Sequence, residues 1–178
     1  LSASMLDGDP PKIRYARQLA AALSYIALTN LDRLNVSTFT DTLGPGTQLV
    51  RGRNNLATVL DMLNSAPSGE KTNMDAAFRE FTLRYHSKGL VFVISDFLDP
   101  VNLKEGLKRL ASRKHDILLL QVLDRNELDP DLRGDWALTD RETGDVVEVS
   151  VSPRLLSGYK RRMLAYLDDL RKFSRKLG

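Results

Sequence analysis

The sequence predicts a three-layer α/β/α sandwich built around a mostly parallel β-sheet. Segments with helical periodicity alternate with short apolar runs along most of the chain. Two of these runs, residues 89–95 and 117–123, are uninterrupted, as is typical of strands covered by helices on both faces. Strands that alternate with helices of this length imply parallel strands joined by right-handed crossovers. With 178 residues, the chain is expected to form one domain, residues 1–178, with a sizeable core.

The first half of the chain opens with a predicted helix over residues 12–30. Its apolar residues recur at helical spacing: Ile13, Ala16, Leu19, Ala20, Leu23, Ile26 and Ala27. Residues 33–40 alternate in polarity and predict a strand, and Gly44-Pro45-Gly46 is expected to break that pattern. A second helix is indicated by the spacing of Leu56, Val59, Leu60 and Leu63.

The second half continues the alternation until a hairpin interrupts it. A third helix carries Met74 to Tyr85, and Thr72 or Asn73 is placed to cap its start. The strand over residues 89–95 ends at Asp96, and the strand over 117–123, after another helix, ends at Asp124. The period then changes to two, which predicts an inserted β-hairpin near residues 136–151. A last helix follows Pro153.

The composition is that of a soluble globular protein, with 42% hydrophobic and 28% charged residues. No apolar run approaches the roughly 18 residues of a membrane span. The absence of cysteine excludes a disulfide framework and a thiolate nucleophile, and it agrees with a reducing compartment. We therefore expect a cytoplasmic protein.

Four oxygen-bearing residues, Ser2, Ser4, Thr72 and Asp96, follow predicted strands or lie in loops at one edge of the sheet. Ligands of open α/β sheets bind at the carboxyl ends of the strands. Serines two residues apart at the end of a strand point the same way. Hard cations such as Mg²⁺ prefer oxygen ligands. These residues are the candidate ligands of a metal site, with Mg²⁺ or Mn²⁺ as the ion.

Nearly the whole chain resembles the bacterial domain of unknown function 58 family, a branch of the von Willebrand factor A-like proteins. The resemblance is carried by several stretches: Leu1 to Met5, Lys12 to Leu23, Asp32-Arg33, Arg51 to Asn55, Val93 to Asp99 and Thr139 to Gly144. It implies a von Willebrand A-like (Rossmann-like) sandwich with a metal ion-dependent adhesion site (MIDAS). Ser2, Ser4, Thr72 and Asp96 match its ligand positions, Thr72 most loosely. The first aspartate of the family pattern Asp-x-Ser-x-Ser would precede Leu1, and we expect the first and last strands of the fold to lie outside the chain.

The resemblance also implies a non-enzymatic role. Family members are often associated with MoxR-type AAA+ ATPases, which implies an adaptor in protein maturation or complex assembly. An ion with few carboxylate ligands can accept one more anionic oxygen, which an Asp or Glu of the partner protein can supply. The partner is expected to be the ATPase or its client.

Two other functions stay open. Asp96, Asp99 and Asp124 could hold metal ions for phosphoester hydrolysis, although capping and turn roles are favoured for Asp99 and Asp124. Both histidines, His86 and His115, are expected at the surface. No Gly-x-Ser-x-Gly or phosphate-binding loop is present, so serine-hydrolase and P-loop chemistry have no support.

The other alternative is binding of nucleic acid or an acidic partner through the basic last helix. Residues 154–178 hold eight Lys or Arg and two Asp, so that the basic charge of the chain is concentrated there. The residues are Arg154, Lys160, Arg161, Arg162, Arg171, Lys172, Arg175 and Lys176. Because no aromatic residues are interleaved for base stacking, a solvated helix face is favoured and no nucleic acid is expected.

Overall fold

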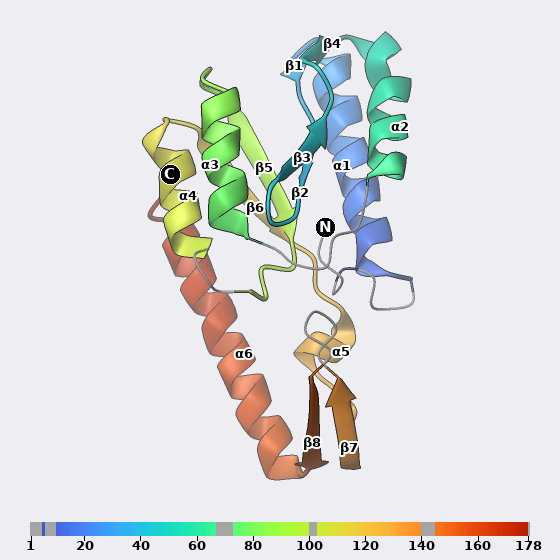
Figure 1. Cartoon of the computed structure of the whole chain (residues 1–178), viewed down its shortest axis with the longest axis vertical. Helices are drawn as coiled ribbons and strands as arrows, with labels where there is room; N and C mark the ends of the chain where they lie inside the picture. The colour runs from blue at the N-terminus through green and yellow to red at the C-terminus, as the bar shows by residue number, and fades with distance from the viewer. Residues whose placement is uncertain (1–4, 6–9, 67–72, 100–102, 140–144, 178) are drawn as a thin grey trace.

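The computed structural model describes Met5 and residues 10–66, 73–99, 103–139 and 145–177 (Figure 1). Its helices are α1 (Lys12–Thr29), α2 (Leu56–Ser65), α3 (Met74–Arg84), α4 (Leu103–Ser112), α5 (Arg125–Leu128) and α6 (Pro153–Ser174), with a 3-10 turn at Arg53–Asn55. Its strands are β1 (Arg33–Leu34), β2 (Ser37–Phe39), β3 (Leu43–Gly46), β4 (Val50–Arg51), β5 (Leu90–Ser95), β6 (Asp116–Gln121), β7 (Gly134–Thr139) and β8 (Val146–Val151).

Most predicted elements are present. The predicted helices correspond to α1, α2, α3, α4 and α6, and β7 pairs with β8 in the predicted hairpin. Asn73 caps α3, because its side chain accepts a hydrogen bond from Ala76 N at 3.1 Å. Ser152 caps α6 in the same way, and Pro153 is its first residue. The short helix α5 has no apolar periodicity and was not expected.

The predicted three-layer sandwich with a mostly parallel sheet is wrong. In the described part of the chain the strands form four two-stranded sheets, of which three are antiparallel: β1–β4, β2–β3 and β7–β8. Among the described strands only β5 and β6 run parallel, in register from Leu90 opposite Asp116 to Ser95 opposite Gln121.

The segment around Gly46 accounts for part of this difference. We expected Gly44-Pro45-Gly46 to end the strand pattern, but the chain folds back there as β3 and pairs with β2. A Cβ atom on Gly46 would lie 2.2 Å from Ser37 Oγ and 2.8 Å from Val36 O. Only glycine permits this close approach of β3 to β2. The residues of the predicted strand over 33–40 therefore pair with nearby segments of the chain, as β1 with β4 and β2 with β3, and not with a long parallel sheet.

A cavity of about 550 Å³ separates these local pairs from β5. It is lined by residues of α1, of the β1–β3 region and by every residue from Leu90 to Ile94. The apolar side chains of β5 and β6 were expected to be buried on both faces, but Leu90, Phe92 and Leu118 are exposed. The parallel pair is therefore covered by helices mainly on the side of α3, α4 and α6 (Figure 1).

The largest hydrophobic core joins α3, α4 and α6 to β5. It contains Met74, Phe78, Val93, Phe97, Leu103, Leu107, Leu110 and Leu170. A smaller cluster joins Met5 and α1 to Val122 and Ile94, at the carboxyl end of the parallel pair. These two clusters fix the position of the segment that follows β5.

The two histidines differ in burial. His86 is exposed, as expected, but His115 is 5% exposed and stands edge-on to Phe81, with ring centroids 5.8 Å apart. Neither of its ring nitrogens has a hydrogen-bond partner among the described residues. His115 is therefore a core residue, and the expectation of a surface position was wrong.

No helix in the described ranges is both long enough and apolar enough to cross a membrane.

Candidate functional site at the carboxyl end of β5

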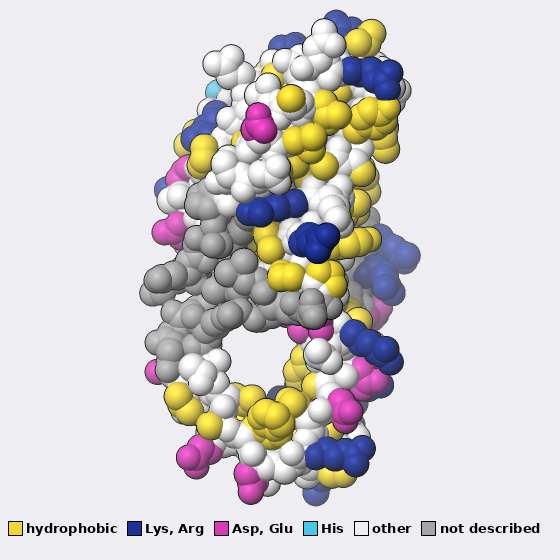
Figure 2. Space-filling view, turned by 90° about the vertical axis from the view of Figure 1, so that its right-hand side faces the viewer, with side chains coloured by type: hydrophobic (Ala, Val, Ile, Leu, Met, Phe, Trp, Pro, Cys, Tyr) yellow, Lys and Arg dark blue, Asp and Glu magenta, His cyan; other side chains and the backbone are white. Residues whose placement is uncertain are grey.

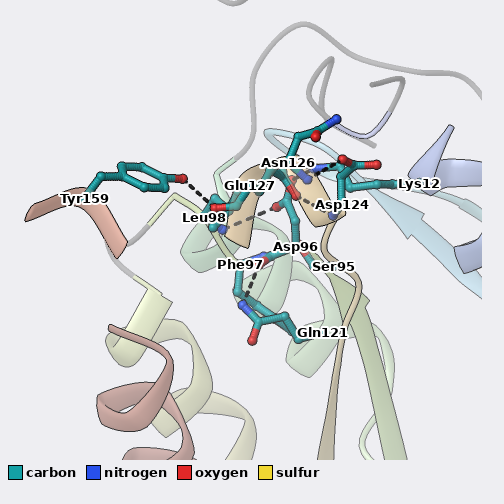
Figure 3. A network of polar contacts seen from close by, with 10 residues as sticks. All are labelled: Lys12, Ser95, Asp96, Phe97, Leu98, Gln121, Asp124, Asn126, Glu127 and Tyr159. Atoms are coloured by element: carbon teal, nitrogen blue, oxygen red, sulfur yellow. Dashed lines mark hydrogen bonds and ion pairs between the residues drawn. The ribbon is translucent and has the colours of Figure 1, made fainter. Parts of the chain in front are cut away.

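The site is centred on Asp96, which directly follows β5 and is 4% exposed. Its Oδ1 accepts a hydrogen bond from the backbone N–H of Leu98 at 3.3 Å, which closes a tight turn after the strand (Figure 3). Its carbonyl oxygen accepts a hydrogen bond from Gln121 Nε2 at 2.8 Å, which ties the turn to the end of β6. The carboxylate is thus placed at the edge of the sheet where the sequence predicted a site.

The backbone after Asp96 adopts an unusual conformation. Phe97 has a φ angle of 53°, in the left-handed region that residues other than glycine rarely adopt. Its ring is fully buried in the main core, and Tyr166 of α6 donates a hydrogen bond to its carbonyl oxygen. Core packing and this hydrogen bond stabilise the strained backbone, and the turn holds the Asp96 carboxylate in place.

Lys12 approaches Asp96 from α1. Its Nζ lies 3.0 Å from Asp96 Oδ2 and 2.5 Å from Glu127 Oε1, and the residue is 3% exposed. A lysine so completely buried is rare unless it is paired. It is also the first residue of α1, where the helix dipole disfavours a positive charge. The two carboxylates therefore hold the ammonium against both effects.

Glu127 is fixed by the first turn of α5. Asp124 caps this helix by accepting a hydrogen bond from Asn126 N at 2.8 Å. Glu127 completes a capping box, since its Oε2 accepts a hydrogen bond from Asp124 N at 2.7 Å. Tyr159 of α6 donates a hydrogen bond to the Glu127 carbonyl oxygen at 2.7 Å. One carboxylate oxygen of Glu127 thus serves the helix, and the other binds Lys12.

The charges of the site change the pKa values of its neighbours. Burial lowers the pKa of Lys12, but hydrogen bonds and attraction from Glu127 and Asp96 outweigh it, so the pKa lies above its ordinary value. Burial raises the pKa of Tyr159, and the charge of Glu127 adds to this shift. Burial also raises the pKa of Tyr166, with further contributions from Asp99, Asp96 and Asp169. Lys12 is therefore charged and both tyrosines are neutral near pH 7.

The predicted ligand set is placed only in part. Asp96 lies at the predicted edge, whereas Ser2, Ser4 and Thr72 fall outside the described residues. Within the described ranges, no three His, Cys, Asp or Glu side chains converge as a metal centre. The Lys12 ammonium nevertheless stands at the Asp96 carboxylate as a positive charge supplied by the chain itself. The Asp96 carboxylate, the described part of the proposed site, therefore has the chemistry to bind a cation.

The other two aspartates proposed for catalysis are placed differently. Asp124 has a structural role, but as the N-cap of α5 and not as the start of a turn, which was the role favoured for it. Asp99 lies near Tyr166, whose pKa it helps to raise, and the helix start proposed at Val101 is outside the described residues.

Two residues of the site, Lys12 and Glu127, were not singled out from the sequence. Lys12 was included in the first predicted helix without any special role. A lysine at a helix start and a glutamate in an irregular segment are usually solvated, so neither draws notice by itself. The capping-box pattern, Asp124 followed by Glu127 three residues later, was the one available signal.

The basic surface of α6 is partly neutralised within the chain. Lys172 pairs with Asp168 at 2.6 Å, and Lys160 pairs with Asp129 at 3.1 Å. The hydrogen bond and charge of Asp168 raise the pKa of Lys172. These exposed pairs are typical of a solvated helix face.

Comparison with known proteins gives a family match over most of the chain. A model of the family described as "Protein of unknown function DUF58" matches residues 2–166. Uncharacterized proteins of Mycobacterium bovis and Mycobacterium tuberculosis are 33% identical over 114 residues. The matched segment is 64% of this chain but only 35% of each relative, so the match covers about a third of their length. An uncharacterized protein of Mycobacterium avium is 31% identical over 114 residues, which cover 64% of this chain and 66% of that protein.

Among solved structures, the chain resembles the conserved hypothetical protein BatB from Bacteroides thetaiotaomicron. The TM-score is 0.55 at 15% sequence identity, over 98% of this chain and 95% of that chain. At this level of identity the likeness concerns the fold alone.

Proposed function

The chain belongs to the DUF58 family of proteins of unknown function, and from this premise we propose that it is a protein–protein interaction module rather than an enzyme. The proposed contact surface is the carboxyl end of β5 and β6, with Asp96 at its centre. The observation that carries the proposal is the Asp96 carboxylate, held rigidly at a strand end and already in contact with a positive charge. Such a site is suited to binding a cation that a partner protein shares.

The surroundings of Asp96 support a protein as the partner. The β7–β8 hairpin extends beyond the carboxyl ends of β5 and β6, on the same side as the site (Figure 1). On one of its faces Trp136 is opposite Val149 and Leu138 is opposite Val147. Trp136, Leu138 and Val147 are all exposed. Exposed aromatic and aliphatic side chains on a projecting hairpin favour contact with another protein over binding of a small molecule.

The hairpin end of the molecule stands away from the rest. Figure 2 shows an opening between this end and the upper part of the molecule, with hydrophobic side chains along the lower rim. Apart from Val151, no hairpin residue described is buried. The hairpin therefore adds little to the core, which leaves its apolar face for a partner.

We further propose that Ser2, Ser4, Thr72 and Asp96 hold Mg²⁺ or Mn²⁺. When bound, the ion would act as a Lewis acid that accepts one more anionic oxygen from an Asp or Glu of the partner. The chain's own contribution is to place Asp96, which the turn at Phe97 and Leu98 and the hydrogen bond from Gln121 hold at the edge.

As partner we propose a MoxR-type AAA+ ATPase or its client, in the cytoplasm. This part of the proposal rests on the family resemblance drawn from the sequence. The role would be that of an adaptor in protein maturation or complex assembly.

The test is retention of the ATPase by the immobilised full-length protein, with Mg²⁺ or with EDTA. We expect the ATPase to be retained in Mg²⁺ and to be lost in EDTA. The Asp96→Asn variant should not retain it even in Mg²⁺, because the carboxylate that holds the ion is removed. Asp116→Asn is the matched control: Asp116 is an exposed carboxylate at the opposite end of the same parallel pair. This control should retain the ATPase as the unaltered protein does.

Two results would contradict the proposal. One is equal retention by Asp96→Asn and Asp116→Asn. The other is metal-dependent turnover of a phosphoester by the full-length protein that is lost in Asp96→Asn, which would show an enzyme in place of an adaptor.

A further inference from the structure

Lys12 stands where an ion bound to Asp96 would exert its charge. The ammonium is 3.0 Å from Asp96 Oδ2. Mg²⁺ binds carboxylate oxygens at about 2.1 Å. An ion on the same oxygen would therefore lie within about 5 Å of the Lys12 nitrogen. Two positive charges so close in a buried site repel strongly, since little water is present to screen them.

Lys12 has a second acceptor that does not depend on Asp96. Glu127 Oε1 is 2.5 Å from its Nζ, and the capping box and Tyr159 keep Glu127 in place. The long lysine side chain reaches both carboxylates, which come from different elements, the end of β5 and the first turn of α5 (Figure 3). Release of Asp96 would thus leave the ammonium paired with Glu127 and not isolated in the interior.

We propose that Lys12 is a built-in competitor that regulates cation binding at Asp96. The inference rests on the proposed function, because it concerns the same carboxylate. A divalent ion binds the Asp96 carboxylate only when the Lys12 ammonium leaves Asp96 and stays paired with Glu127 alone. This competition lowers the affinity of the protein for the free ion. A partner carboxylate adds a further ligand and shifts the balance toward the ion. Ion and partner would therefore bind cooperatively.

The first test is calorimetric titration of Mn²⁺ into the full-length protein and its Lys12→Gln variant. An opposite charge within about 4–6 Å changes the proton affinity of a carboxylate by about tenfold to a thousandfold. We expect Lys12→Gln to bind Mn²⁺ at least about tenfold more tightly, by the same electrostatic reasoning. Lys172→Gln is the control, because it removes a lysine from an exposed pair with Asp168 and should leave the affinity unchanged.

A second pair of variants keeps Lys12 and does not depend on whether Lys12→Gln folds. Glu127→Gln removes the acceptor onto which Lys12 withdraws, so Lys12 should hold Asp96 more firmly and Mn²⁺ affinity should fall severalfold. Asp124→Asn removes one negative charge from the same helix start, and asparagine caps a helix as well as aspartate. The Asp124 side chain binds the backbone N–H of Asn126, whereas Lys12 pairs with Glu127 and Asp96, so Asp124→Asn should lose clearly less affinity than Glu127→Gln.

The outcomes separate the inference from the function. In one outcome Asp96→Asn abolishes Mn²⁺ binding, but Lys12→Gln does not strengthen it and Glu127→Gln weakens it no more than Asp124→Asn does. This result would overturn the role of Lys12 and leave the proposed site standing. No saturable binding in any of these proteins would overturn both. If Lys12→Gln binds Mn²⁺ more tightly, but adding Ser4→Ala to it does not weaken that binding, the result would support Lys12 as a competitor and contradict the proposed ligand set.

Discussion

At the scale of single residues, the turn after β5 joins strain, burial and charge. Phe97 adopts a left-handed backbone, and the Tyr166 hydroxyl binds its carbonyl oxygen. The same hydroxyl lies in the field of Asp96, Asp99 and Asp169. Tyr166 therefore supports the geometry of Asp96 without being one of its ligands.

We expect Tyr166→Phe to lower the free energy of unfolding by about 1 kcal/mol, because one hydrogen bond to a buried carbonyl is lost. The effect should also depend on pH. Since burial, Asp99, Asp96 and Asp169 raise the pKa of Tyr166, the unfolded chain releases this proton first as the pH rises. The contribution of Tyr166 is full below its ordinary pKa of 10.0 and is lost as the pH rises through the folded value.

The measurement is urea denaturation at pH 8 and above pH 10. Tyr166→Phe should show a smaller loss of stability at alkaline pH than the unaltered protein. Tyr15→Phe, a change at an exposed residue of α1, serves as control and should stay within about 0.5 kcal/mol. An equal alkaline loss in all three proteins would contradict this account of Tyr166.

Sequence reasoning at this scale located Asp96 but not its cation. Asp96 could be found because an aspartate directly after an apolar run lies at the edge of a sheet. Lys12 could not, since it meets Asp96 across 84 positions of the chain and only tertiary packing brings the two together. His115 was misplaced for a similar reason: its burial depends on contact with α3.

At the scale of elements, the packing of α3 against α4 depends on a close approach at Gly106. A Cβ atom there would lie 2.8 Å from Phe78 Cδ2 and 3.2 Å from Asp75 Cα. Arg109 and Asp75 add an ion pair of 3.2 Å between the same helices. The approach of α3 and α4 completes the core in which Phe97 is anchored.

Replacing two helical glycines by alanine should therefore give opposite results. We expect Gly106→Ala to destabilise the protein by a net amount of about 1 kcal/mol, because the clash with α3 outweighs the better helix propensity. Gly158→Ala in α6 should stabilise it by up to about 1 kcal/mol, since nothing lies within 4 Å of the new methyl group. Thermal denaturation of both variants provides the comparison, and the same sign for both would contradict the close packing of α3 and α4.

The sequence predicted where helices and strands occur better than how strands pair. Helical periodicity identifies α1 and α6 because it depends only on neighbours along one chain segment. Pairing depends on which segments meet in space. The fold-back at β3 requires a glycine at position 46, and no sequence pattern predicts that this residue lies against β2. The mostly parallel sheet was therefore an inference from alternation, and the local antiparallel pairs overturned it.

At the scale of the whole molecule, the proposed site and the apolar hairpin lie at the same end. β5 and β6 direct Asp96 toward this end, α5 supplies Glu127, and β7 and β8 project beyond it (Figure 1). The basic residues of α6 include two that are paired with acidic groups of the chain. A partner that approaches this end would meet a carboxylate site and an apolar face together.

The most direct test of the account is the location of a bound ion by paramagnetic broadening of NMR signals. With substoichiometric Mn²⁺ added to the full-length protein, we expect the backbone signals of Asp96, Phe97 and Leu98 to broaden first. The signal of Asp116, at the far end of β6, should stay sharp. Broadening centred on another surface, with the signals around Asp96 unaffected, would contradict a cation-binding site at the carboxyl end of β5.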